Sequence, residues 1–183
     1  IEPRMYATLR TALFDTGAKI AICGASCVVD DRSIGTKVAF RSAKLVEGDV
    51  LPRFCRLKFG SGVLWNKLYV RDVIEAPSLM ELERAVDASE DYIVNFGAFA
   101  RTPSVLTCPE MMYNYVLHAD NASARRDPWA TFARLFRAYV VCLEIYAAEN
   151  RSYARLIDEL YLKQLHFSAY RVGDPAPANT VRE

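Results

Sequence analysis

The hydrophobic pattern of this 183-residue chain changes its period near Ile74. Between residues 18 and 74, short apolar and β-branched runs are separated by turn residues, whereas apolar residues after position 74 recur every three or four positions. The first pattern predicts strands and the second predicts helices. Strands that precede helices, without regular alternation of the two, predict an α+β fold.

A short N-terminal helix is expected before the strands. Pro3 is tolerated in a first helical turn, apolar residues keep helical spacing from Met5 to Leu13, and Gly17 favours a helix end. Four to five strands follow before residue 74. We expect them to form a compact antiparallel sheet or a small barrel.

A C-terminal bundle of about four helices is predicted after residue 74. Three capping signals mark helix starts, namely the box SLME at 78–81, Thr107 with Pro109, and Asp127 with Pro128. The predicted helices run from 78 to about 96, from 107 to about 119, from 128 to 149 and from 151 to 168.

Three regions follow from these patterns. Residues 1–74 hold the N-terminal helix and a basic antiparallel β region, residues 75–170 are helical, and residues 171–183 form a mobile, proline-rich tail. The first two regions are expected to form one compact unit, because a chain of this length buries a core without disulfides or metals.

The composition is typical of a globular protein, with 52% apolar and 25% charged residues. No window of 18 residues is uniformly apolar, so we expect no membrane-spanning helix. The N-terminus also lacks the basic stretch and apolar run of a signal peptide. Five cysteines scattered over apolar segments favour reduced thiols in an intracellular protein of the cytoplasm or nucleus.

The stretch RFCRLKFGSGVLWNKLYVRDV, residues 53–73, predicts a β-hairpin whose register decides its two faces. A three-residue turn mixes apolar and basic side chains on both faces. A two-residue Gly60-Ser61 turn of type II′ gathers the apolar residues on one face, and we expect this register. The opposite face then carries Phe54, Arg56, Lys58, Val63, Trp65, Lys67, Tyr69 and Arg71.

This second face has the composition of a nucleic-acid-binding surface, because bases stack on exposed aromatic rings while Lys and Arg neutralise phosphates. The same pattern also fits cation–aromatic pairs that stabilise an exposed sheet, or Trp65 and Tyr69 packed beneath the helices. The predicted binding residues are Phe54, Arg56, Lys58, Trp65, Lys67, Tyr69, Arg71, Arg125 and Arg126.

Further arginines lie on the predicted helices. Arg134 and Arg137 share one helix face, as do Arg151 and Arg155, and both pairs are placed to extend an anion-binding groove. Ion pairs with neighbouring carboxylates are the alternative. The available carboxylates are Glu144, Glu149, Asp158 and Glu159.

No catalytic residue, metal site or cofactor is predicted. The two histidines, His118 and His166, have no motif that pairs them with a cysteine nucleophile. The segment CGASC supplies one pair of cysteines, whereas a structural zinc site needs a second pair. Asp30 and Asp31 follow an apolar strand but have no identifiable third carboxylate for metal chemistry.

Charge is distributed unevenly along the chain. Residues 18–73 carry ten basic and five acidic residues, whereas residues 74–183 carry eleven and fifteen. We therefore expect a non-enzymatic protein that binds RNA or single-stranded nucleic acid and has no membrane partner. Two alternatives stay open. One is an assembly subunit of a larger complex, such as a viral one, that binds a protein partner or itself, and the other is a cysteine-dependent enzyme.

Overall fold

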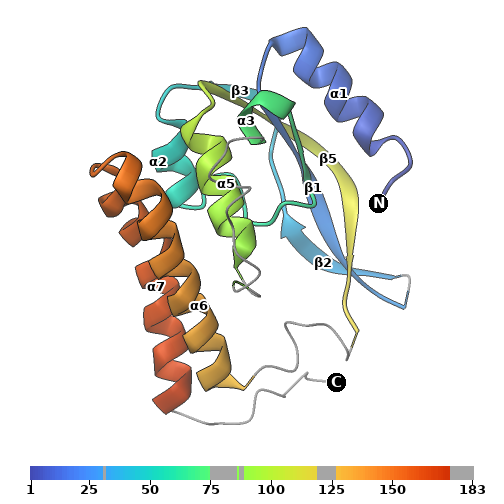
Figure 1. Cartoon of the computed structure of the whole chain (residues 1–183). Coiled ribbons are helices and arrows are strands. Elements are labelled where there is room, and N and C mark those ends of the chain that lie inside the picture. The colour runs from blue at the N-terminus through green and yellow to red at the C-terminus, as the bar shows by residue number, and fades with distance from the viewer. Residues whose placement is uncertain (31, 75–85, 87–88, 119–126, 174–183) are drawn as a thin grey trace.

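The computed structural model describes residues 1–30, 32–74, 86, 89–118 and 127–173. Its helices are α1 (Met5–Thr16), α2 (Val50–Cys55), α3 (Arg71–Ile74), α5 (Glu90–Ala100), α6 (Pro128–Cys142), the π-helix η1 (Leu143–Ala147) and α7 (Tyr153–Gly173). Its strands are β1 (Ile20–Val29), β2 (Arg32–Val38), β3 (Lys44–Glu47), β4 (Lys67–Tyr69) and β5 (Ser104–Val116). The α+β class and the N-terminal helix are confirmed (Figure 1).

Five strands form one curled, mixed sheet with β1 near its centre (Figure 1). On one side β1 pairs in parallel with β5, and β5 pairs antiparallel with β3. On its other side β1 pairs antiparallel with β4 at residues 20–22 and with β2 at residues 25–29. Four of these strands precede residue 74, as predicted, but the parallel β1–β5 pair means that the sheet is not antiparallel throughout.

The capping pattern at Thr107 and Pro109 predicts a helix, and this prediction is wrong because β5 runs through both residues. Hydrogen bonding to β1 decides the conformation of this segment. Between two paired positions β1 advances from Ile22 to Gly24 while β5 advances from Thr107 to Met111, so β5 carries two extra residues around the proline. Proline lacks an N–H donor and is tolerated in strands at such irregularities.

The predicted hairpin at residues 53–73 is also wrong. Helix α2 ends at Cys55, a loop follows, and β4 pairs with β1 instead of with the segment before Gly60. The backbone is left-handed at Leu57 and Gly60, with φ angles of 54° and 87°. The positive φ of Gly60 suits the expected turn, but that of Leu57 is incompatible with a regular strand before it.

Helices cover both faces of the sheet (Figure 1). The apolar side of α1 lies in one cluster with Ala21 and Cys23 of β1. Residues of α2, α5, α6 and α7 lie in a second cluster with Ile20 and Ile22. Because alternate residues of β1 are buried on opposite faces, its sequence is apolar at nearly every position.

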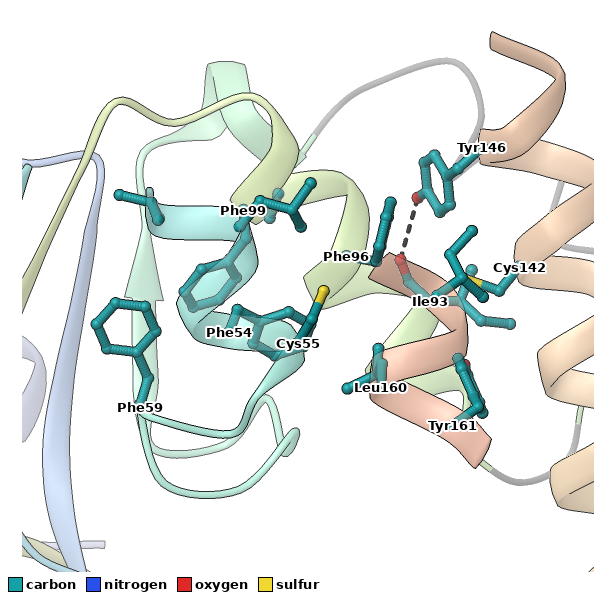
Figure 2. Close-up of a cluster of buried hydrophobic side chains, with 14 of the residues drawn as sticks. Phe54, Cys55, Phe59, Ile93, Phe96, Phe99, Cys142, Tyr146, Leu160 and Tyr161 are labelled. Atoms are coloured by element: carbon teal, nitrogen blue, oxygen red, sulfur yellow. Dashed lines mark hydrogen bonds between the residues drawn. The ribbon is translucent and has the colours of Figure 1, made fainter. Parts of the chain in front are cut away.

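The larger core lies where α2, α5, η1 and α7 meet (Figure 2). Phe54 of α2 stacks on Phe99 of α5, with ring centroids 4.4 Å apart. Tyr146 of η1 is fully buried, and its hydroxyl donates to the backbone oxygen of Ile93 at 3.0 Å. A Cβ atom at Gly97 would lie 2.2 Å from the Tyr146 hydroxyl oxygen, so glycine permits this close approach of the two helices.

The C-terminal helices agree in part with the predictions. The helix expected at 128–149 is α6 continued by η1, and the helix expected at 151–168 is α7, which also includes residues 171–173 of the predicted tail. The capping box at 78–81 and residues 174–183 lie outside the described residues. Because β5 (Ser104–Val116) replaces the helix expected at 107–119, the described helices after residue 74 are α3 at its boundary, α5, α6 with η1, and α7, and they are not clearly a four-helix bundle. None of the described helices is long and apolar enough to cross a membrane.

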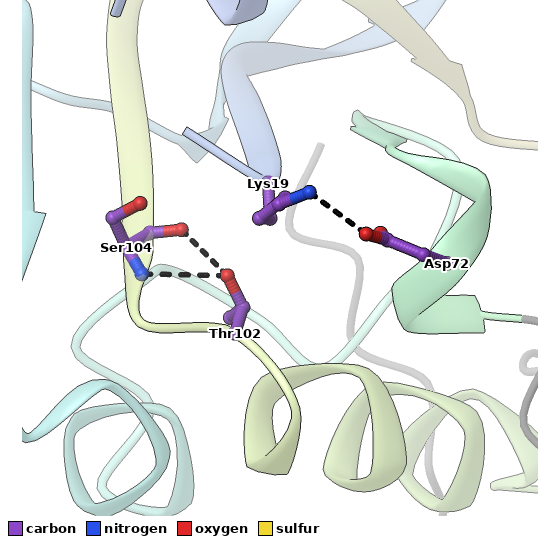
Figure 3. A network of polar contacts seen from close by, with 4 residues as sticks. All are labelled: Lys19, Asp72, Thr102 and Ser104. Carbon is purple, nitrogen blue, oxygen red and sulfur yellow. Dashed lines mark hydrogen bonds and ion pairs between the residues drawn. The ribbon is translucent and has the colours of Figure 1, made fainter. Parts of the chain in front are cut away.

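Polar contacts fix the end of the sheet where β1 and β5 begin (Figure 3). Lys19 precedes β1, and its Nζ lies 2.7 Å from Asp72 Oδ2 on α3. Thr102 Oγ1 donates to the Ser104 backbone oxygen at 2.8 Å and accepts from the Ser104 N–H at 3.3 Å. The first contact ties α3 to β1, and the second shapes the connection from α5 to β5.

Replacing Gly97 by alanine tests the close packing of α5 on η1. The new methyl group must displace the buried Tyr146 side chain, and overpacking costs about 1–3 kcal/mol of unfolding free energy. The better helix propensity of alanine offsets about 1 kcal/mol of that cost, so we expect a net loss in urea unfolding. Gly35→Ala in β2 is the control, because a Cβ atom there meets nothing within 4 Å. A Gly97→Ala variant that is more stable than the original protein by about 1 kcal/mol, the full gain in helix propensity, would contradict this packing.

Candidate functional site

The structure separates the residues that the hairpin prediction places on one face. Phe54 is 1% exposed and Lys67 is 5% exposed, so both side chains are interior. Tyr69 is half-buried, and its hydroxyl donates to Asn95 Oδ1 of α5 at 2.6 Å. These three side chains stabilise the fold and present no common surface to a partner.

The buried Lys67 ammonium organises the loop before β4. Its Nζ donates to the backbone oxygens of Ser61 and Val63 and, at 3.1 Å, to Asn66 Oδ1. All three ammonium donors are therefore used within the protein. Burial lowers the pKa of Lys67 to about 7.

Helix α5 holds the same loop from the other side. Asn95 is fully buried, and its Nδ2 donates to the backbone oxygens of Gly62 at 2.6 Å and Asp91 at 2.9 Å. Burial and the neighbouring Glu90 carboxylate raise the pKa of Asp91 to about 6. The loop is thus fixed by a buried polar network that has no signature in the sequence.

Trp65 packs on the protein's own sheet. Its ring stacks on Tyr113 and Tyr115 of β5, with centroids 4.1 Å and 5.5 Å away. Lys37 Nζ lies 4.8 Å from the centroid of the Tyr115 ring. A cation and three rings therefore form an aromatic ladder across the sheet, which is close to the alternative expectation of cation–aromatic stabilisation.

The guanidinium of Arg56, one of the predicted binding residues, is paired with a carboxylate of another helix. Arg56 Nε donates to Glu159 Oε2 at 2.9 Å and its Nη2 donates to Glu159 Oε1 at 3.4 Å, which joins α2 to α7. Arg155 lies 4.0 Å from the same carboxylate. Arg71 begins α3 at the surface. Arg125 and Arg126 lie outside the described residues, so their predicted role stays a prediction.

A pocket of about 300 Å³ opens where the β2–β3 connection faces β3, α2 and the turn after α2. Lys58 lines this pocket, whereas the other predicted binding residues that the structure describes do not. The lining residues are Ala39, Phe40, Arg41, Ser42, Lys44, Val46, Arg53, Lys58, Phe59 and Thr107.

The pocket has a buried floor and an exposed cationic rim. Val46, Phe59 and Thr107 are buried and form the floor. The cationic rim consists of four exposed side chains, those of Arg41, Lys44, Arg53 and Lys58.

Short-range contacts bring the rim residues together. The Lys58 N–H donates to the Arg53 backbone oxygen at 2.9 Å, so the turn after α2 folds back beside the helix. On the opposite wall, Thr107 Oγ1 of β5 donates to the Lys44 backbone oxygen at 3.4 Å, which holds β3 against the sheet. The rim is therefore built on a helix and on paired strands.

The electrostatics of the pocket favour an anion. Within the described part of the chain, no acidic residue lines it, and no rim cation forms an ion pair with a carboxylate. Positive charges gathered in a concave site focus their potential there and attract anions. A bound anion also relieves the mutual repulsion of the four cations.

Sequence reasoning missed Arg41, Lys44 and Arg53 as site residues. They belong to a connection, a strand and a helix, which the sheet pairing and the α2 turn bring together. The basic excess of residues 18–73 was the one available signal, but it does not say which cations converge.

Burial disfavours the thiolate form at four of the five cysteines. Burial raises the pKa of Cys55 to about 12 and that of Cys108 to about 11, and it also raises the pKa of Cys23 and Cys142. Such thiols stay protonated near neutral pH, whereas the thiolate is the nucleophile. Among the described residues, no group of three or more His, Cys, Asp or Glu side chains is arranged to hold a metal ion.

No protein-family model matches the chain, and neither does any curated protein. The pocket is therefore interpreted from its own side chains. Four cations over an apolar floor, beside the half-buried ring of Phe40, have the chemistry of a receptor for an anion that also carries an apolar or aromatic group.

The depressed pKa of Lys67 predicts a pH dependence of stability. Its folded pKa of about 7 lies below the unfolded value, which is about 10.4. Between these values the unfolded state binds more protons, so the unfolding free energy contributed by this group rises with pH. From pH 7 to pH 9 the rise is roughly 2 kcal/mol.

Urea unfolding of the original protein and of Lys67→Met at several pH values isolates this contribution. Cysteine and tyrosine ionisation affects both proteins, so the difference between their unfolding free energies reports Lys67. We expect the original protein to gain stability relative to the variant as the pH rises. A difference that stays constant from pH 7 to pH 9 would show that Lys67 keeps an ordinary pKa.

Proposed function

We propose that the protein binds single-stranded nucleic acid, either RNA or DNA, through the basic pocket. The observation that supports this proposal is the convergence of four rim cations without ion-pair partners among the described carboxylates. Lys and Arg side chains of this kind neutralise phosphates and release counterions, which supplies most of the affinity of sequence-independent binding.

The aromatic content and size of the pocket favour a single strand over a duplex. Phe40 lines the pocket beside the cations and is half-buried, so part of its ring is accessible. Stacking of one base on such a ring contributes about 1–3 kcal/mol. A volume of about 300 Å³ is suited to one unstacked nucleotide, whereas the bases of a duplex are paired and stacked on each other and are not available to Phe40.

The proposed interface differs from the predicted hairpin face. Lys58 is retained, and Arg41, Lys44 and Arg53 join it. The interior side chains Phe54, Lys67 and Tyr69 are left out because their contacts lie within the fold.

A fluorescence anisotropy titration with a labelled 12-nucleotide strand tests the proposal. Arg53→Ala/Lys58→Ala should bind about tenfold or more weakly, which corresponds to 1.4 kcal/mol or more. Removing two phosphate contacts should also make the slope of log K against log salt less negative by about 1.4.

The matched control is Arg10→Ala/Lys163→Ala, which removes the same charge from exposed positions on α1 and α7. This control should bind with the affinity of the original protein and should keep most of the slope of log K against log salt. Equal weakening of the two double variants would assign the binding to net charge, and no binding at low salt would refute the proposal.

A second candidate function is self-association through α6. Trp129 and Phe136 are 62% and 48% exposed, and Phe132 stacks between them with centroids 5.8 Å and 6.2 Å away. Exposed Ala133 shares this side of the helix and lies four residues from both Trp129 and Arg137. Two antiparallel copies of α6 that cross at Ala133 would therefore place Arg137 of one copy against Trp129 of the other, a favourable cation–π contact.

Sedimentation velocity across a range of concentrations tests this interface. The original protein should show a monomer–dimer equilibrium, and Trp129→Ser/Phe136→Ser should shift it to the monomer because the apolar contact is lost. Phe167→Ser/Tyr170→Ser removes two exposed aromatic side chains of α7 and should leave the dimer intact. A strictly monomeric original protein would exclude the interface.

A further inference from the structure

We infer that the basic pocket binds a terminal phosphomonoester, the group at a phosphorylated end of a strand, in preference to an internal phosphodiester. This inference rests on the proposed function and specifies which part of the strand enters the pocket. It is carried by the small size of the pocket, the number of rim cations and the donor types around the pocket.

The pocket is small and lies over a buried floor. Val46 is 8% exposed, Phe59 is 3% exposed and Thr107 is 6% exposed, so the side chains below the cations belong to the core and the sheet. The volume of about 300 Å³ lies at the lower end of the range of ligand pockets, which suits one nucleotide.

The charge of the rim matches a monoester better than a diester. A phosphomonoester carries about −1.5 to −2 charges at pH 7, whereas an internal phosphodiester carries about −1. Four cations facing one pocket repel each other. A dianion offsets more of this repulsion than a monoanion does, so the electrostatic preference is for the strand end.

The donor types also suit three terminal oxygens. Arg41 and Arg53 supply planar guanidinium groups, which bind two phosphate oxygens at once, while the lysines act as single charges. Ser42 adds a hydroxyl donor at the pocket wall. A monoester offers three non-bridging oxygens to these donors and an internal diester offers two.

Phe40 gives the strand end a second contact. Its half-buried ring lines the same pocket, so a base attached to the bound phosphate is within the same small volume. Stacking on this ring distinguishes a nucleotide from inorganic phosphate. The expected ligand is therefore a terminal nucleotide with its phosphate among the rim cations.

A competition experiment tests the inference. Four unlabelled 12-mers of the same sequence compete separately with one labelled strand for the protein. One carries a 5′-phosphate, one a 3′-phosphate, one has hydroxyl groups at both ends, and one is covalently circular. A strand with a phosphorylated end should compete about tenfold more strongly than the hydroxyl-ended strand, equivalent to one decade in Kd. The two phosphorylated strands show which end is taken. The circular strand should compete no better than the hydroxyl-ended one.

Two further measurements test whether the preference for a phosphorylated end depends on Phe40 and on the rim cations. Adenosine monophosphate should displace the strand at lower concentration than inorganic phosphate does, because only the nucleotide stacks on Phe40. Arg53→Gln/Lys58→Gln should abolish the preference for phosphorylated ends, and Arg10→Gln/Lys163→Gln should keep it. Circular dichroism establishes that each variant is folded.

Different results would contradict the preference for a strand end and the binding of single strands. Equal competition by the circular and the phosphorylated strands would overturn the end preference while single-strand binding stands. Inorganic phosphate as effective as adenosine monophosphate would overturn the assignment of a nucleotide end. No binding of any strand would overturn the proposed function together with the inference.

Discussion

The parallel pairing of β1 with β5 is the interaction on which the remaining structure depends. It joins residues 20–28 to residues 105–116 and so connects the first strand of the chain to the last one among the described residues. Because β5 also pairs with β3, it carries Lys44 into the sheet and places Thr107 at the pocket floor. With α1 on one face and the other helices opposite, β1 is buried on both sides. Loss of this pair would remove the wall against which the rim is built.

The loop between α2 and β4 is the second constraint on the pocket. Lys67 of β4 and Asn95 of α5 both donate hydrogen bonds to backbone oxygens of this loop. At the beginning of the loop, the Lys58 N–H donates to the Arg53 backbone oxygen at 2.9 Å, and Gly60 lies where a Cβ atom would be 2.6 Å from Val38 of β2. The segment that contains Lys58 and Phe59 is thus fixed at both sides before any ligand binds. A site whose cations are held in advance loses less conformational entropy on binding.

Local periodicity predicted α1, α6 and α7 because each keeps an apolar stripe over several turns. It failed where tertiary contacts decide the conformation. Thr107 and Pro109 imitate a helix start, but pairing with β1 makes them part of a strand. The mixed residues after Arg53 resemble a hairpin, yet Phe54 packs on Phe99 as part of a helix. Lys58 was predictable from the sequence as a basic surface residue. The convergence of the other rim cations was not, because it depends on the order of the strands in the sheet.

The central claim is that the cationic rim is where a nucleic-acid strand enters the protein. Nuclear magnetic resonance of the isotope-labelled protein, titrated with an unlabelled single strand, tests this most directly. Saturable amide shifts should concentrate at residues 39–44, 53–59 and 107, which line the pocket or lie between lining residues. Shifts confined to α6 and α7, or changes that never saturate, would contradict the claim.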